Sequence, residues 1–198
     1  MRIIGVTGPT GAGKSLLCRY IQEKNIPSID ADRVYHDMLT PPSTCLDAIC
    51  DAFGDGVLAP DGSLDRVKLG VIVFSSHEKL ELLNRTVLAK VLERIRQLID
   101  EYEKQGFDTV TVDAPTLIES GFHRECSTVI SVIASAELRL SRIKARDSID
   151  NEKAKMRIDA QKSDEFYKAS SNFVLYNDGD TDKLRESFRE LTEKLGII

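Results

Sequence analysis

The sequence predicts an α/β fold in which helices cover both faces of a parallel sheet, giving three layers. Short apolar segments rich in β-branched residues alternate along the chain with segments of helical periodicity, and this alternation is typical of parallel strands joined by helices. The first apolar segment, residues 3–7, leads into a glycine-rich stretch at 8–15, and residues 16–21 continue as a helix. This order of strand, loop and helix predicts a phosphate-binding site.

The glycine-rich stretch reads GPTGAGKS and matches G-x-x-x-x-G-K-S, the pattern of a phosphate-binding P-loop. Gly8, Gly11 and Gly13 lack side chains that would keep a phosphate off the backbone, so successive N–H groups can point inward at an anion. Lys14 is expected to reach the outer phosphates of ATP, and Ser15 to offer its hydroxyl to Mg²⁺. The alternative is a turn that matches by chance, but the flanking strand and helix favour nucleotide binding.

Composition and charge argue against several classes of protein. The 198 residues suit one domain, and their net charge of −5 argues against a broad basic surface for nucleic acid or anionic membranes. No apolar run approaches the roughly 18 residues of a membrane span, and no secretory signal precedes the first strand. The four cysteines lack C-x-x-C or zinc spacing, which favours reduced thiols. We therefore expect a soluble, cytoplasmic protein that binds neither nucleic acid nor membrane.

The second predicted strand, residues 26–30, delivers Asp30 and Asp32 to its carboxyl end, where ligands gather in α/β sheets. Residues 31–85 show helical segments broken by glycine and proline turn signals, with no obvious strand. Because this segment is short and opens directly off a core strand, we interpret it as a helical insertion rather than as an independent domain. The remaining expected elements are a helix at 86–104, strands at 109–113 and 129–133, a helix at 137–147 with a polar helical stretch to about 168, a strand at 173–176 and a closing amphipathic helix at 184–195.

Two carboxylates near strand ends are candidates for chemistry. Asp32 follows the second strand, which we expect to lie next to the strand of the P-loop, and it could accept a proton from an acceptor hydroxyl as the base of a kinase. Alternatively, Asp30 or Asp32 caps the helix that follows. Asp113 ends a strand as a Walker-B acid does, so it could hold Mg²⁺ directly or through water, or it could cap a turn.

Arginines gather on the helix predicted at 137–147. Arg142 and Arg146 lie four residues apart and share a helix face, with Arg139 three residues before them. A planar guanidinium suits phosphoryl oxygens, and a cluster that closes over two substrates also excludes water that would hydrolyse ATP. The alternative is a solvated helix face whose arginines pair with neighbouring carboxylates.

Several motifs follow one another along the chain: the GPTGAGKS loop, IDAD at 29–32, GSLDR at 62–66, DAPTLIE at 113–119, Gln161 and NDG at 177–179. In this order they resemble the dephospho-coenzyme A kinase family. The resemblance also includes Arg142 and Arg146, and it spans nearly the whole chain. The P-loop alone is shared by many families, so the specific part is its combination with the other motifs.

The resemblance implies transfer of the γ-phosphoryl group of ATP to the ribose 3′-hydroxyl of dephospho-CoA, giving CoA and ADP in the last step of CoA biosynthesis. The implied fold is a P-loop NTPase fold of the nucleoside-monophosphate-kinase type within one domain. Its parts would be a core at 1–30, 86–136 and 171–198, a helical insert at 31–85 that binds the acceptor, and a helical lid segment at 137–170.

The resemblance also implies roles for individual residues. Asp32 would be the base, and Lys14 and Arg142 would stabilise charge on the moving phosphoryl group. Asp32, Arg66 and Pro115 would contact dephospho-CoA, and Ser15 and Asp113 would bind Mg²⁺. Asn177 would lie near the adenine of ATP. The full set of expected ATP contacts is Gly8, Gly11, Ala12, Gly13, Lys14, Ser15, Leu16, Arg146 and Asn177.

The sequence departs from the family pattern in three places. Leu88-Ala89 stands where the family usually has His-Pro, Thr116 replaces a leucine, and Arg139 replaces a common glutamine of the lid segment. We expect these departures to affect acceptor binding more than ATP binding. A kinase of another small acceptor, such as a nucleoside monophosphate or a sugar acid, and a non-catalytic nucleotide sensor are the alternative functions.

Overall fold

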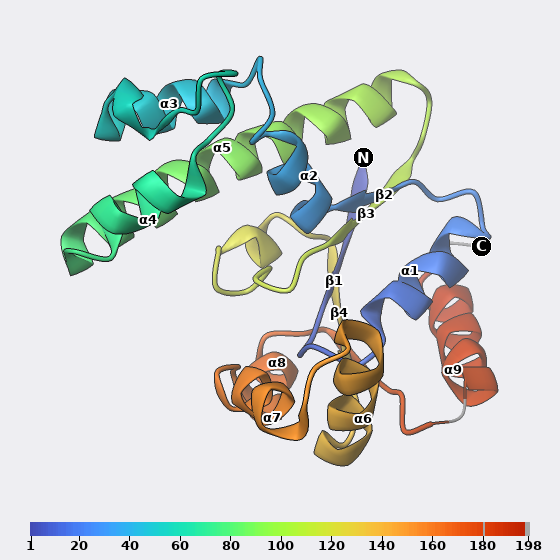
Figure 1. The fold of residues 1–198 in the computed structure, drawn as a ribbon. Coiled ribbons are helices and arrows are strands. Elements are labelled where there is room, and N and C mark those ends of the chain that lie inside the picture. The colour runs from blue at the N-terminus through green and yellow to red at the C-terminus, as the bar shows by residue number, and fades with distance from the viewer. Residues whose placement is uncertain (180, 197–198) are drawn as a thin grey trace. The chain divides into compact units, whose positions relative to one another are not determined.

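The computed structural model describes residues 1–179 and 181–196, and its elements are shown in Figure 1. The chain divides into two compact units. Met1–Ile29 and Tyr102–Ile198 form the first unit, and Asp30–Glu101 form the second. The second unit contains the insert predicted at 31–85 and reaches further along the chain.

A five-stranded sheet forms the centre of the fold. Its strands are β1 (Arg2–Thr7), β2 (Ser28–Asp30), β3 (Thr109–Asp113), β4 (Thr128–Ile133) and β5 (Phe173–Tyr176). Their order across the sheet is β2-β3-β1-β4-β5. β1 runs parallel to both β3 and β4, and β4 runs parallel to β5. The predicted α/β fold with a parallel sheet is therefore confirmed.

The expected neighbour of the P-loop strand is wrong. β3, and not β2, pairs with β1, and β2 lies at the edge of the sheet beyond β3. The burial of the two strands gives the reason. Val110 and Val112 of β3 are fully buried and suit a central position, whereas the short β2 ends in the exposed Asp30 and suits an edge.

Helices connect the strands. They are α1 (Lys14–Gln22), α2 (Ala31–Asp37), α3 (Thr44–Phe53), α4 (Arg66–Val73), α5 (His77–Lys104), α6 (Ala136–Asp147), α7 (Asn151–Asp159), α8 (Asp164–Ala169) and α9 (Thr181–Lys194). α5 begins at His77 rather than at 86, because Leu80, Leu83 and Val87 continue its apolar stripe against the core of the second unit. No helix in the described ranges is long and apolar enough to cross a bilayer.

The first unit has apolar contacts on both faces of its sheet. On one face, Leu17 of α1 and Phe188 of α9 join a cluster with Val132 of β4. On the other, Ile133 packs with Tyr167 of α8, because successive residues of a strand point to opposite faces. Full burial of a side chain such as Leu17 contributes about 1.5–3 kcal/mol. This packing fixes α1, and with it the P-loop at its start, on the sheet.

The second unit is helical and has its own apolar core. The buried members of that core come from the turn after α2, from α3, from the turn at Asp55–Val57 and from α4, and they are Leu39, Cys45, Ile49, Val57, Leu69 and Val73. Among the described residues of this unit, the only β-contact outside the named strands is an isolated bridge between Leu58 and Leu64. The absence of a long strand here agrees with the helical pattern of the sequence.

Candidate active site

The P-loop lies between β1 and α1, in the expected strand, loop and helix arrangement. Gly8 and Gly13 have φ angles of 132° and 105°, in the region that favours glycine. A Cβ on Gly8 would lie 2.2 Å from the carbonyl oxygen of Val132, and one on Gly13 would lie 2.1 Å from Nδ2 of Asn177. Only glycine therefore fits both the backbone conformation and the space at these two positions.

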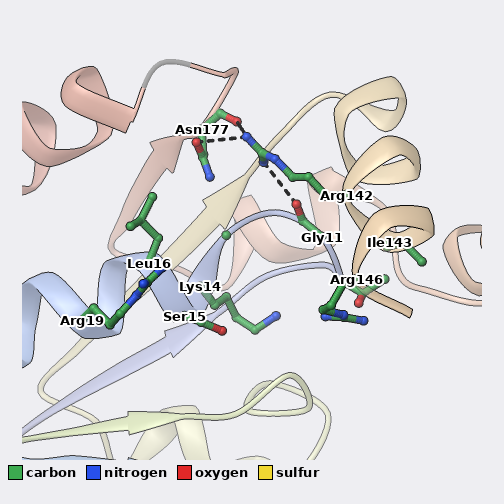
Figure 2. Close-up of a pocket in the computed structure, with 11 residues that line it drawn as sticks. Gly11, Lys14, Ser15, Leu16, Arg19, Arg142, Ile143, Arg146 and Asn177 are labelled. Atoms are coloured by element: carbon green, nitrogen blue, oxygen red, sulfur yellow. Dashed lines mark hydrogen bonds between the residues drawn. The ribbon is translucent and has the colours of Figure 1, made fainter. Parts of the chain in front are cut away.

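A pocket of about 330 Å³ opens beside this loop (Figure 2). Its wall is formed by the P-loop, the first turns of α1, the inner side of α6 and the residue after β5. The predicted site residues in this wall are Gly11, Gly13, Lys14, Ser15, Leu16, Arg142, Arg146 and Asn177. Its volume lies within the range of small-molecule sites, about 300–1,000 Å³. Lys14, Arg142 and Arg146 give the pocket a positive charge that suits a polyphosphate.

The guanidinium of Arg142 is held by hydrogen bonds to the P-loop and to Asn177. Its Nη1 donates to the carbonyl oxygens of Gly11 and Ala12 at 3.2 and 3.4 Å, and its Nη2 donates to the backbone and side-chain oxygens of Asn177 at 3.1 and 3.3 Å (Figure 2). Asn177, which is 2% exposed, donates in turn from Nδ2 to Ala12 at 2.8 Å. The solvated-face alternative is therefore wrong for Arg142, and its charge is held at the pocket wall.

Arg146 behaves differently, although it also lines the pocket. Its Nε and Nη2 donate to the two carboxylate oxygens of Asp147 at 2.7 and 3.0 Å, and Arg157 pairs with the same carboxylate. These hydrogen bonds and charges lower the pKa of Asp147. The pairing with a neighbouring carboxylate that the sequence left open is thus present at Arg146, alongside its place in the pocket.

Lys14, Ser15 and Asp113 lie around the start of α1. Nζ of Lys14 donates to the carbonyl oxygen of Gly8 at 2.8 Å, and Ser15 is exposed in the pocket wall. Asp113 ends β3 opposite Val6 of β1, so this residue lies beside the strand end from which the P-loop starts. Hydroxyl and carboxylate oxygens are the ligands that Mg²⁺ prefers. The donor set of Ser15 and Asp113 therefore fits the predicted metal.

The thiol of Cys18 lies within reach of both of these charges. Burial raises its pKa, and the carboxylate of Asp113 raises it further by charge and hydrogen bonding, whereas the charge of Lys14 acts in the opposite direction. Cys18 belongs to α1, in the turn after Lys14. Asp113 and Lys14 therefore both act on the same short stretch of this helix.

The remaining predicted residues lie outside this pocket. Asp32 and Arg66 belong to the second unit, in the first turns of α2 and α4. Asp30 caps α2, because its carboxylate accepts from the N–H groups of Asp32 and Arg33 at 2.9 and 3.1 Å. Pro115 belongs to the first unit, where its carbonyl oxygen accepts from the hydroxyl of Thr7 at 3.3 Å. The roles assigned to these residues stay predictions.

Two arginines near the loop have contacts that sequence reasoning did not predict. Arg19 lines the pocket, and its spacing of four residues from Ser15 on α1 could have indicated this. Arg139 was expected on the same helix as Arg142 and Arg146, and its expected effect on acceptor binding stays a prediction. Its guanidinium contacts the P-loop, since Nε donates to the carbonyl oxygen of Thr10 at 3.0 Å. No local pattern in the sequence marks that contact.

Comparison with known proteins identifies the family. The family model described as dephospho-CoA kinase matches residues 2–183. A dephospho-CoA kinase of Carboxydothermus hydrogenoformans is 36% identical over 192 residues, covering 97% of this chain and 93% of that protein. One from Arabidopsis thaliana is 34% identical over 191 residues, covering 96% and 82%.

Solved structures agree with this result. The chain is similar to a dephospho-CoA kinase from Campylobacter jejuni, with a TM-score of 0.70, 26% identity and 98% of each chain covered. A shikimate kinase from Acinetobacter baumannii has a TM-score of 0.56 at 17% identity, with 99% of this chain and 94% of that chain covered, which shows a shared fold alone. From the match over nearly its whole length, the chain belongs to the dephospho-CoA kinase family.

Proposed function

We propose that this chain transfers the γ-phosphoryl group of ATP to the ribose 3′-hydroxyl of dephospho-CoA, giving CoA and ADP. The observation that carries the proposal is the cationic pocket beside a glycine-dependent P-loop, in a chain whose family is defined by this kinase activity. Kinase activity implies ATP as the phosphoryl donor, and this reaction is the final step of CoA biosynthesis.

The pocket explains how the donor would be held. In the transition state of phosphoryl transfer, charge is spread over the oxygens of the moving group, so catalysis depends on positioning and on fixed positive charge. Arg142 supplies such a charge, because its hydrogen bonds to Gly11, Ala12 and Asn177 fix its guanidinium before ATP arrives. Lys14 follows the last glycine of the loop and would act on the outer phosphates. Both residues are therefore assigned to stabilisation of the transferred group.

Ser15 and Asp113 would hold Mg²⁺ in this proposal. Bound there, the ion would neutralise charge on the β- and γ-phosphate oxygens. The support is the chemistry of the donors and the position of Asp113 opposite Val6, close to the base of the P-loop.

Asp32 is assigned as the base that accepts the proton of the 3′-hydroxyl. Its alternative role as the helix cap belongs to Asp30, so capping does not account for the carboxylate of Asp32. Arg66 and Pro115 are assigned to binding of the acceptor. The charge of Arg66 would attract a phosphate of dephospho-CoA, and Pro115 is assigned from its position after β3.

An acceptor panel tests the proposal. ADP release is measured with dephospho-CoA, AMP, CMP, gluconate or shikimate as the only acceptor, with Lys14→Met as the inactive control. We expect turnover with dephospho-CoA alone, and a product that carries the new phosphate on the 3′-oxygen. Turnover confined to a mononucleotide or a sugar acid would overturn the choice of acceptor. ADP binding without transfer to any acceptor would favour the nucleotide sensor.

A further inference from the structure

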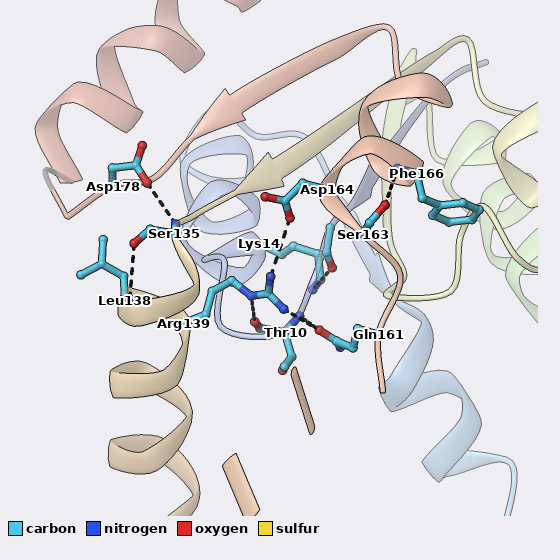
Figure 3. A network of polar contacts seen from close by, with 11 residues as sticks. Thr10, Lys14, Ser135, Leu138, Arg139, Gln161, Ser163, Asp164, Phe166 and Asp178 are labelled. Carbon is cyan, nitrogen blue, oxygen red and sulfur yellow. Dashed lines mark hydrogen bonds and ion pairs between the residues drawn. The ribbon is translucent and has the colours of Figure 1, made fainter. Parts of the chain in front are cut away.

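Arg139 of α6 is a buried charge that the reaction described above does not use. It is 6% exposed, and burial lowers its pKa, which the charge of Asp164 opposes. An arginine in such a place is costly unless it is paired and hydrogen-bonded. Its guanidinium has three partners, Thr10, Gln161 and Asp164, and they surround it (Figure 3).

Arg139 and Gln161 together hold both backbone polar groups of Thr10. Nε of Arg139 donates to the carbonyl oxygen of Thr10 at 3.0 Å, and Oε1 of Gln161 accepts from the N–H group of Thr10 at 2.8 Å. Gln161 is itself tied to Arg139, whose Nη2 donates to the same Oε1 at 3.1 Å. The Thr10 residue of the P-loop is therefore held by side chains of the lid segment (137–170).

Asp164 and Gly11 complete this contact. Asp164 lies 3.7 Å from Nη1 of Arg139 and is the first residue of α8, so the guanidinium joins α6 to α8. The backbone of α6 also touches the loop, because a Cβ on Gly11 would lie 2.9 Å from the carbonyl oxygen of Arg139. Thr10 and Gly11 both line the pocket. Arg139 and its partners therefore support Thr10 and Gly11 in the wall of the pocket.

These contacts affect how far the P-loop is ordered before the ligand binds. A loop with three glycines has many accessible backbone conformations, and ordering it on ligand binding costs conformational entropy. Contacts that hold the loop in its binding conformation remove part of that cost from the binding step. A glutamine at position 139 would offer one amide group, whereas arginine offers five N–H donors in a fixed plane. Arginine can therefore serve Thr10, Gln161 and Asp164 at the same time.

We propose that Arg139, held by Gln161 and Asp164, is a positioning residue that fixes Thr10 and so pre-forms the P-loop for the polyphosphate of the nucleotide. The effect reaches the ligand through the loop and not through direct contact. The proposal rests on the proposed function only for the identity of that nucleotide. It predicts that losing Arg139 weakens nucleotide binding without changing recognition of the acceptor.

The test measures the Kd of ADP for the full chain by calorimetry, together with KM for each substrate. Arg139→Met keeps an unbranched, flexible side chain, although a shorter one, and removes every side-chain donor. We expect ADP binding to weaken about tenfold, as the loss of a hydrogen bond from a charged group does, and KM for ATP to rise similarly. KM for dephospho-CoA should change by less than about twofold. Arg189→Met is the matched control, because Arg189 is exposed on α9 and its guanidinium pairs with Glu186 of the same helix; this variant should bind ADP like the wild type.

A double-mutant cycle with Gln161→Met identifies the route of the effect. Because Arg139 and Gln161 hold the same residue, the double variant should weaken ADP binding by clearly less than the product of the two single effects. Arg139→Gln keeps a donor that can reach Thr10, so its ADP affinity should lie between those of the wild type and Arg139→Met.

Some results would overturn the proposal. Wild-type ADP affinity in both Arg139→Met and Gln161→Met, even with a lower Tm, would show that the cluster only holds the lid helices together. An equal rise of the KM values for ATP and for dephospho-CoA would lead to the same conclusion. Should Arg139→Met fail to fold, Gln161→Met and Asp164→Asn decide the question by the same titration. ADP binding needs no acceptor, so these outcomes are separate from failure of the dephospho-CoA assay.

Discussion

The two units of the molecule are stabilised in different ways. In the first unit, polar side chains such as Arg139 and Asn177 are buried and bonded to the P-loop backbone. Every buried polar or charged residue within 1–179 and 181–196 lies in this unit, whereas the buried core of the second unit is apolar. Buried hydrogen bonds fix one geometry, while apolar packing tolerates adjustment. We therefore expect nucleotide binding by the first unit to be sensitive to small changes in the shape of a residue. In the second unit, we expect effects from substitutions that remove packing or a surface group.

Glycine substitutions should show the largest contrast between the units. In Gly8→Ala the new Cβ meets a backbone oxygen at 2.2 Å in a strained conformation, so the loop must move. We expect ADP affinity, measured by calorimetry, to fall about a thousandfold, which corresponds to about 4 kcal/mol. The matched control is Gly56→Ala in the second unit, where nothing lies within 4 Å of the added Cβ. It should leave ADP affinity unchanged and alter the free energy of unfolding by less than about 1 kcal/mol. Normal ADP binding by Gly8→Ala would contradict the account of the loop.

Asp32→Asn should affect turnover and spare nucleotide binding. Loss of a general base lowers kcat about a hundredfold, or about 2.7 kcal/mol in the barrier. The Kd of ADP should not change, because the pocket beside the P-loop is lined by residues of the first unit. Asp37→Asn is the control, since Asp37 is an exposed carboxylate on the same helix, paired with Arg33. Unchanged turnover in Asp32→Asn would remove this residue from the mechanism.

The sequence predicted those parts of the fold that depend on local signals. The P-loop needed only eight adjacent residues, and the strands at 109–113 and 173–176 have the predicted bounds because their apolar runs are sharply delimited. The order of strands was not predictable, because pairing β3 instead of β2 with β1 is decided by burial over the whole sheet. The partners of Arg139 were missed for a similar reason, since Thr10 lies 129 positions away in the sequence.

The residues of the candidate site also differ in how far the sequence could predict them. Lys14 and Ser15 were assigned from the P-loop motif, Arg142 from its helix spacing and the family resemblance, and Asn177 from the resemblance alone. The structure brings these four residues together in one pocket. Asp32 was assigned from its place after a strand as well as from the family resemblance, and Arg66 from the resemblance alone. Both residues belong to the second unit, and their roles stay predictions. Composition and periodicity describe the apolar core of that unit well, but they do not show which exposed side chains meet a ligand.

The smallest expected effect lies on α4, where two valines separate packing from exposure. Val73 is 2% exposed in the core of the second unit, whereas Val71 is 72% exposed on the same helix. Val73→Ala should lower the free energy of unfolding by about 2 kcal/mol through lost burial and the cavity that remains. Val71→Ala should change it by less than about 0.5 kcal/mol, because no packing is lost and alanine has the higher helix propensity. Urea unfolding followed by circular dichroism measures both. A loss of more than about 1 kcal/mol in the free energy of unfolding of Val71→Ala would mean that this face of α4 is packed in solution. The contrast between an open surface on the second unit and a hydrogen-bonded P-loop region in the first unit would then fail.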